Sequence, residues 1–155
     1  TESLAERPFS YAFKHFPLSS RCNPHIKRDM HPRACHAAMA AICAEQQGAF
    51  WEMHDLLFAQ QQQLEDQDLK SYAQQLKLNL ESFITCLSDE KTQERLSADI
   101  ALGAKLGVRG TPFFFVNGWN FKGAKRSPAI KQAVARYAYG VQEPQEPSEE
   151  AKAHE

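Results

Sequence analysis

The 155-residue chain is long enough to bury a hydrophobic core as a single domain. Its hydrophobic content of 43% and charged content of 24% are ordinary for a globular protein, and its formal net charge of -1 argues against a nucleic-acid footprint. No apolar run approaches the ~20 residues that a membrane helix needs. The four cysteines are an even number, which favours paired disulfides in an oxidising compartment.

The N-terminal residues predict the end of a helix followed by a strand. Residues 1–6 look like the last turn of a helix, which Pro8 ends. In residues 9–16 aromatic side chains dominate and alternate with smaller or polar ones, a pattern typical of a half-buried strand. Pro17 closes the strand, and a polar loop rich in turn-forming residues extends over residues 19–31.

The middle of the chain predicts five helices. Pro32 suits the first turn of the first helix, and Gly48 its end. Asn79 is the expected cap of the fourth helix and Ser88 that of the fifth. The predicted segments are residues 32–48, 50–62, 66–77, 79–87 and 88–107. The inward face of the fifth helix is expected to carry Leu96, Ile100, Gly103 and Leu106.

The pattern then changes to a hairpin and a last helix. Residues 113–116 are a short apolar run, Asn117-Gly118 is the strongest two-residue hairpin signal, and residues 119–121 form the return strand. Ser127-Pro128 reads as the cap and first position of a final helix that ends at Gly140.

Residues 141–155 are rich in proline and glutamate, and they lack an aliphatic anchor. A disordered acidic tail is therefore expected after one domain of residues 1–140. The predicted order is strand, helices, hairpin and helix. It indicates an α/β fold with a helical block inserted between sheet strands.

Three segments resemble motifs of the DsbA-like thioredoxin-fold proteins, and they occur in the order of that family. Residues 11–18 read Y-A-F-K-H-F-P-L, residues 47–54 read Q-G-A-F-W-E-M-H, and residues 107–118 read G-V-R-G-T-P-F-F-F-V-N-G. Each motif alone is only suggestive. Together they cover nearly all of the chain up to Tyr139 and point to a thioredoxin-like fold.

The resemblance implies a substrate-binding loop at Gly110, Thr111 and Pro112. In the family the Thr-Pro bond of this loop is cis, although only ~5–6% of X–Pro bonds in folded proteins are cis. The backbone beside it pairs with an extended substrate segment by strand addition. The alternative is that Pro112 merely starts a strand.

The family places its reactive C-x-x-C at the start of the helix that precedes the strand of residues 11–18. No C-x-x-C occurs here, so no catalytic residue is expected in this chain, and the motif is expected upstream of Thr1. The preceding sheet strand would also be missing, which would leave two hydrophobic strands without their shared neighbour. We therefore expect a fragment that lacks the N-terminal βα portion and is inactive alone.

In its complete form the protein is expected to be a thiol–disulfide oxidoreductase in a periplasmic or otherwise extracytoplasmic compartment, with no cofactor. Its implied partners are protein or peptide thiols and disulfides, and the resemblance suggests a DsbB-like or quinone-linked membrane redox partner. Neither nucleic-acid binding nor membrane insertion is expected. The alternative function is a redox-inactive thioredoxin-like module that binds peptides along the cis-proline strand.

The four cysteines permit three disulfide pairings. Cys35 and Cys43 lie eight residues apart on one predicted helix, so their Cα atoms are ~12 Å apart, beyond disulfide reach. Of the remaining pairings, Cys22–Cys35 with Cys43–Cys86 is favoured as a pair of structural bonds. The alternative is that Cys43 and Cys86 are buried free thiols.

A structural zinc site is a competing hypothesis for the polar loop, since cysteines and histidines gather there. Its possible ligands are Cys22, His25, His31, Cys35 and His36. The spacing matches no familiar zinc motif, so no metal is expected. His15 and His54 are expected to be partly buried structural residues, because the sequence identifies neither a nucleophile nor an orienting partner for them.

Overall fold

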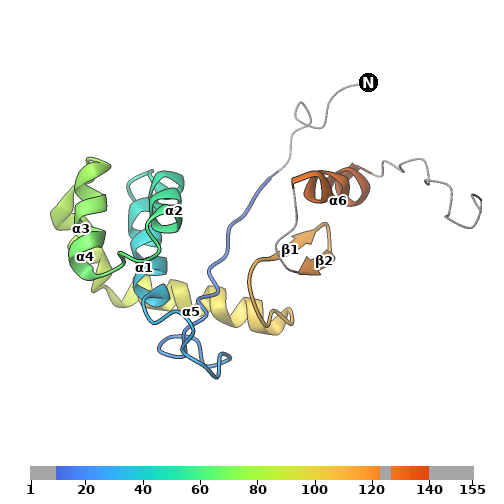
Figure 1. Ribbon diagram of the computed structural model, residues 1–155, viewed down its shortest axis with the longest axis horizontal. Coiled ribbons are helices and arrows are strands. Elements are labelled where there is room, and N and C mark those ends of the chain that lie inside the picture. The colour runs from blue at the N-terminus through green and yellow to red at the C-terminus, as the bar shows by residue number, and fades with distance from the viewer. Residues whose placement is uncertain (1–9, 123–126, 140–155) are drawn as a thin grey trace, which may run out of the picture. The chain divides into compact units, whose positions relative to one another are not determined.

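The computed structural model describes residues 10–122 and 127–139, as coloured in Figure 1. The predicted N-terminal helix end, the Gly140 stop and the acidic tail of residues 141–155 lie outside these residues. The chain divides into two compact units. Of the described residues, the larger comprises 12–110, and the smaller comprises 10–11, 111–122 and 127–139.

Five helices form the larger unit, in agreement with the sequence prediction (Figure 1). They are α1 (Ala34–Glu45), α2 (Phe50–Ala59), α3 (Asp66–Gln75), α4 (Leu80–Leu87) and α5 (Glu90–Lys105). Three of them end in the same hydrogen-bonded turn, in which a residue of positive φ reverses the chain. Those residues are Gly48, Lys77 and Gly107.

The helix caps agree with the prediction at α4 and differ at α5. The Asn79 side chain accepts a hydrogen bond from the Ser82 N–H, as expected of a cap. The prediction that Ser88 caps α5 is wrong: its N–H donates to the Thr85 carbonyl at the end of α4. Asp89 therefore takes the cap position and accepts from the Lys91 N–H.

The boundaries at the two ends of the helical block also differ from the prediction. Helix α1 begins at Ala34, after an Arg33 cap position without a side-chain cap, instead of at Pro32. Leu106 was expected on the inward face of α5 but is 47% exposed. Helix α5 ends there, and beyond the turn at Gly107 it is Val108 that is buried.

A hydrophobic core joins helices α1 to α4 around the alanine-rich face of α1. Small α1 side chains let neighbouring helices approach closely, and larger side chains from the other helices fill the space between them. The fully buried large members are Met53, Leu69 and Phe83. The Cys43–Cys86 disulfide lies inside this core.

The expected strand of residues 9–16 is absent from the described part of this segment, residues 10–16. A strand requires a neighbour that pairs with its backbone groups, and no described segment does so. The segment is held by side chains of α5 instead. The Asp99 carboxylate accepts from the His15 N–H at 3.1 Å and from Lys14 Nζ at 2.9 Å, and Phe16 packs against Gly103.

In the smaller unit, β1 (Phe113–Val116) and β2 (Trp119–Lys122) form the predicted antiparallel hairpin. Asn117 and Gly118 both have positive φ, 47° and 87°, as a tight two-residue turn between twisted strands requires. Helix α6 (Ser127–Tyr139) follows, and the Tyr137 ring stacks on Trp119 at a centroid distance of 5.0 Å.

The described residues are thus mostly helical, with one two-stranded antiparallel sheet. The α/β prediction is confirmed only in that helices and a small sheet are both present. The described sheet contains only the two hairpin strands. None of the described helices has both the length and the apolar character required to cross a bilayer.

The close approach of Phe16 to Gly103 predicts the effect of a larger side chain there. A Cβ atom on residue 103 would lie 2.7 Å from Cδ2 of the buried Phe16 ring. We expect Gly103→Val to lower the free energy of unfolding by about 1–3 kcal/mol, because the ring has to be displaced. Urea denaturation would measure this loss.

The matched control is Ala101→Val, at an exposed position of the same helix. It carries only the helix-propensity penalty of a β-branched residue, less than about 1 kcal/mol. Equal losses in the two variants would contradict the packing explanation.

Candidate functional site

The expected substrate loop lies at the boundary between the two units. Gly110 is half-buried at the end of the larger unit, whereas Thr111 and Pro112 are exposed and lead directly into β1. The Thr111-Pro112 peptide bond is cis. Thr111 and Pro112 are therefore accessible and continuous with the strand β1.

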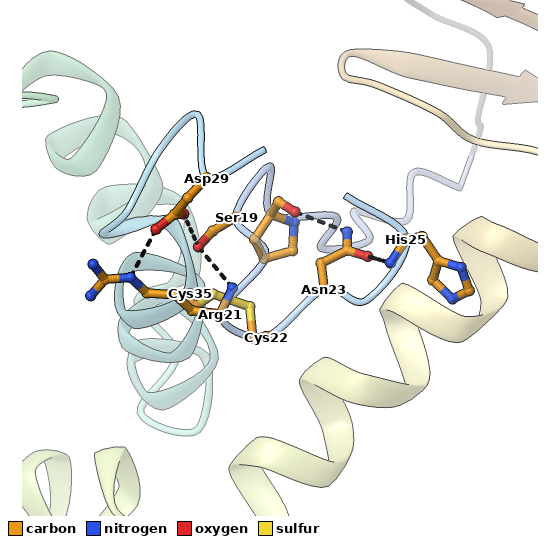
Figure 2. The surroundings of a disulfide bond; sticks show 8 residues. Ser19, Arg21, Cys22, Asn23, His25, Asp29 and Cys35 are labelled. Carbon is orange, nitrogen blue, oxygen red and sulfur yellow. Dashed lines mark hydrogen bonds and ion pairs between the residues drawn. A yellow bond between two sulfur atoms is a disulfide. The ribbon is translucent and has the colours of Figure 1, made fainter. Parts of the chain in front are cut away.

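A disulfide joins the polar loop to the first turn of α1, as Figure 2 shows. Cys22 and Cys35 are bonded, with their Cα atoms 6.0 Å apart. Cys35 is buried on α1, while Cys22 is half-buried in the loop. This is the pairing that the sequence favours for these two residues.

Hydrogen bonds hold the same loop from inside (Figure 2). Asn23 is fully buried; its Nδ2 donates to the Pro17 carbonyl at 2.9 Å, and its Oδ1 accepts from the His25 N–H at 3.1 Å. The buried Ser19 hydroxyl donates to Asp29 at 2.6 Å. The loop is thus fixed by hydrogen bonds of two buried side chains, Ser19 and Asn23, as well as by the disulfide.

Within this loop, the Asp29 carboxylate accepts hydrogen bonds from Ser19 and Arg21. The Ser19 hydroxyl lowers the pKa of its carboxyl, and Arg21, whose Nε lies 2.9 Å from Oδ2, lowers it further. The carboxylate therefore remains ionised and keeps Arg21 in place at neutral pH.

The second disulfide, Cys43–Cys86, ties α1 to α4 with a Cα–Cα distance of 5.7 Å. Both residues are buried, and Sγ of Cys86 lies 3.3 Å from the Thr92 hydroxyl. This bond is enclosed by apolar side chains, unlike the bond at the polar loop.

All four cysteines of the sequence are engaged in these two bonds, so the chain contains no thiol for nucleophilic attack. Cys22 and Cys35, two of the ligands in the zinc hypothesis, are bonded to each other and cannot act as thiolate ligands. Within the described residues, no group of three or more histidine, cysteine and acidic side chains has metal-binding geometry.

His15 is 7% exposed and lies at the point where the N-terminal segment meets α5. Burial lowers the pKa of its imidazole from 6.5 to about 4, and the nearby Asp99 carboxylate only partly opposes this shift. The ring is therefore neutral at physiological pH and contacts aromatic rings, with Phe13 at 5.1 Å. This environment suits the expected structural role.

His54 belongs to an aromatic cluster formed by the segment before the polar loop and by α2. Its ring lies 5.3 Å from Phe13 and 4.7 Å from Phe58, and its Nδ1 is 2.9 Å from the adjacent Asp55 carboxylate. The side chain is partly buried, as expected.

Sequence reasoning missed the buried polar residues that position these elements: Ser19, Asn23 and Asp99. Asp99 offered a signal, because a carboxylate adjacent to Ile100 on the apolar face of α5 needs a partner. Ser19 and Asn23 offered none, because both residue types are common in exposed loops.

Comparison with known proteins places these features in a family. Residues 9–135 match the DSBA-like thioredoxin domain. Over 124 residues the chain is 42% identical to a Na(+)/H(+) antiporter NhaA 3 of Salinispora tropica and to a Na(+)/H(+) antiporter NhaA 1 of Salinispora arenicola, covering 80% of this chain and 18% of each of those proteins. A Na(+)/H(+) antiporter NhaA of Herminiimonas arsenicoxydans is 33% identical over 76% of this chain and 19% of that protein.

The chain thus spans about a fifth of the length of the curated relatives that it matches. No solved structure matches it significantly.

The two disulfides are expected to contribute unequally to stability, because they close loops of different length. Their cysteines are separated by 13 and 43 residues, which corresponds to losses of about 3 kcal/mol for Cys22→Ala with Cys35→Ala and about 4 kcal/mol for Cys43→Ala with Cys86→Ala. Urea denaturation monitored by circular dichroism would measure both. A larger loss for the Cys22 pair would show that loop closure is not the main contribution.

His15 predicts a pH dependence of stability. Its folded pKa of about 4 is below the ordinary 6.5, so in acid the unfolded chain takes up a proton before the folded chain does. The free energy of unfolding should therefore fall between pH 6.5 and pH 4, by up to about 3 kcal/mol from this residue. Denaturation at several pH values should show a shallower slope for His15→Gln than for the wild type.

The control for this measurement is His25→Gln, in which an exposed histidine is replaced. This variant retains His15, so the fall in the free energy of unfolding between pH 6.5 and pH 4 should remain. If His15→Gln also leaves the slope unchanged, the buried imidazole is not the source of the acid sensitivity.

Proposed function

Because the chain belongs to the DSBA-like thioredoxin domain family, we propose that it is the body of a thiol–disulfide oxidoreductase whose reactive cysteine pair lies outside these 155 residues. The observation that carries the proposal is the use of every cysteine in a structural bond, on a chain that matches a redox family. Fold membership alone does not establish an activity, so the proposed redox function depends on a reactive cysteine pair outside these residues.

Disulfide exchange requires a reactive pair of thiols, which this chain does not contain. A thiolate attacks one sulfur of a disulfide, a mixed disulfide forms, and the other sulfur leaves as a thiolate. A second thiol then resolves the mixed disulfide and leaves the reactive pair oxidised. The Cys43–Cys86 bond is enclosed in the core, and the Cys22–Cys35 bond holds a loop, so we assign neither bond to this cycle.

The substrate would bind at the loop of Gly110, Thr111 and Pro112. Thr111 and Pro112 are exposed and precede β1, which pairs with β2 alone among the described strands. The exposed backbone of Thr111 and Pro112, ahead of β1, could pair with an extended peptide. This mode of binding recognises the main chain and suits a protein that acts on many peptides.

The setting we propose is a membrane-associated protein whose redox domain lies in an oxidising, extracytoplasmic compartment. Two disulfides in one small domain favour such a compartment. The relatives named as Na(+)/H(+) antiporters are much longer than the matched region, which supports a domain carried by a membrane protein. Its partners would be protein or peptide thiols and disulfides, with a DsbB-like membrane protein as the possible redox partner.

The second candidate function is a redox-inactive module that binds peptides along β1. The same observation favours it, because a chain without a reactive thiol can still pair with an extended peptide. The two candidates differ only in whether the complete protein carries a vicinal cysteine pair.

Insulin reduction with dithiothreitol tests the proposal. We expect no acceleration by this chain alone, since it has no free thiol. The complete parent protein should accelerate the reaction, and serine substitution of its vicinal cysteines should abolish that effect. The matched control is the parent protein with Cys22→Ala and Cys35→Ala, which should retain turnover because this disulfide is structural.

A parent protein that lacks a vicinal pair, or has one without turnover, would overturn the redox function. Binding of an unfolded peptide by that protein would then support the second candidate. Turnover by the isolated chain would contradict the structural assignment of both disulfides.

A further inference from the structure

Positive charge is concentrated in the loop before α1, which we call the basic loop and define as residues 19–33. It contains four arginine or lysine side chains and one aspartate, and hence a formal charge of +3 in a chain whose net charge is -1. The cationic members are Arg21, Lys27, Arg28 and Arg33. The remaining residues therefore sum to -4, because -1 minus +3 is -4. The basic loop is thus positively charged, whereas the rest of the chain is negatively charged.

Two of the four cations are already neutralised within the larger unit. Arg21 pairs with Asp29, and Arg33 pairs with Glu65 at the start of α3. Within the described part of the chain, the side chains of Lys27 and Arg28 have no acidic or hydrogen-bonding partner, and both residues are exposed. These two side chains are available to an external anion.

An exposed apolar side chain accompanies the free cations. Met30 is 53% exposed, two residues after Arg28, whereas Ile26, which precedes Lys27, is 8% exposed. The loop therefore anchors one aliphatic residue in the protein and presents the other, beside its cations, to the outside. A cationic surface with an exposed apolar side chain suits a lipid headgroup layer, because the cations meet phosphates while the apolar group enters the acyl boundary.

The basic loop is held in shape before any partner arrives. Cys22 is bonded to Cys35, Asn23 is fully buried with both ends of its amide hydrogen-bonded, and the buried Ser19 bonds to Asp29 (Figure 2). The loss of conformational entropy on binding is therefore small compared with that of a flexible basic segment. This rigidity distinguishes the basic loop from an ordinary solvated run of charges.

From these observations we propose that the basic loop binds an anionic phospholipid surface through Lys27 and Arg28, with Met30 entering the interface. An acidic protein would also attract the two cations, and an exposed methionine would suit its interface too; we favour the lipid surface because the setting that we propose is a membrane-associated protein. The proposal rests on the membrane setting described above but not on redox activity. Vesicle binding requires no thiol, so the two tests are independent. The chain can bind vesicles although its parent lacks disulfide exchange, and the parent can catalyse disulfide exchange although the chain does not bind vesicles.

Vesicle flotation with the chain and its disulfides intact tests the inference. The vesicles would contain phosphatidylcholine alone, or phosphatidylcholine with 30% phosphatidylglycerol as an experimental choice of about one anionic lipid in three. We expect binding to the anionic vesicles only, weakened by added salt. Each cation near such a surface contributes about fivefold to partitioning, so Lys27→Glu with Arg28→Glu should reduce binding by about 25-fold or more.

The matched control is Lys91→Glu with Lys105→Glu, which makes the same change of net charge at exposed positions of α5. It should retain most of the binding, because these lysines lie outside the loop. Met30→Ser, which leaves the charge unchanged, should weaken binding several-fold if the side chain enters the interface.

Three results would overturn the inference. They are equal losses in the two charge-reversal variants, equal binding to neutral and anionic vesicles, and binding to polyglutamate without binding to anionic vesicles. The last result would identify an acidic polypeptide as the partner of the basic loop. Circular dichroism would verify that the variants are folded, and no folding defect is expected because the substituted side chains have no partners among the described residues.

Discussion

Helix α1 carries one cysteine of each disulfide, and the larger unit is organised around this arrangement. Cys35 holds the basic loop at the beginning of the helix, and Cys43 holds α4 near its end. Eight residues of helix separate the two, so the bonds act at different places along one rigid rod. The alanines between them let neighbouring helices pack closely, and the core forms where the second bond lies.

One disulfide lies in the hydrophobic core and the other at a polar surface loop, so the two bonds have different effects. Cys43–Cys86 is surrounded by the core and restricts a long stretch of the unfolded chain. Cys22–Cys35 restricts a shorter stretch, but it also shapes a polar surface that carries free cations. Because both bonds serve the scaffold, the redox chemistry that we propose for the family fold must come from other thiols.

Buried polar groups complete what the disulfides begin. Asp99 holds the segment of Lys14 and His15 by accepting from a backbone N–H and from an ammonium group. Inside the basic loop, the Asn23 amide donates to the Pro17 carbonyl and the Ser19 hydroxyl donates to the Asp29 carboxylate. Irregular backbone has no ladder of its own, so such side chains satisfy its hydrogen bonds and determine its path. Residues 11–18, which carry the first motif, are thereby fixed without belonging to a sheet.

The sequence by itself determined the helices and the hairpin, and it excluded one of the three cysteine pairings, because these depend on local rules. Apolar spacing identified the five helices, Asn117-Gly118 placed the turn, and the rise of a helix excluded a Cys35–Cys43 bond. Ordered motifs identified the family, in agreement with the match over residues 9–135.

Only the tertiary structure decided that residues 10–16 are irregular and which contacts Ser19, Asn23 and Asp99 make. An aromatic alternating segment becomes a strand only where another strand pairs with it, and here a carboxylate on a helix distant in sequence holds it instead. The partner of a buried polar side chain is likewise a matter of which segments meet in space, and spacing along the chain does not contain that information.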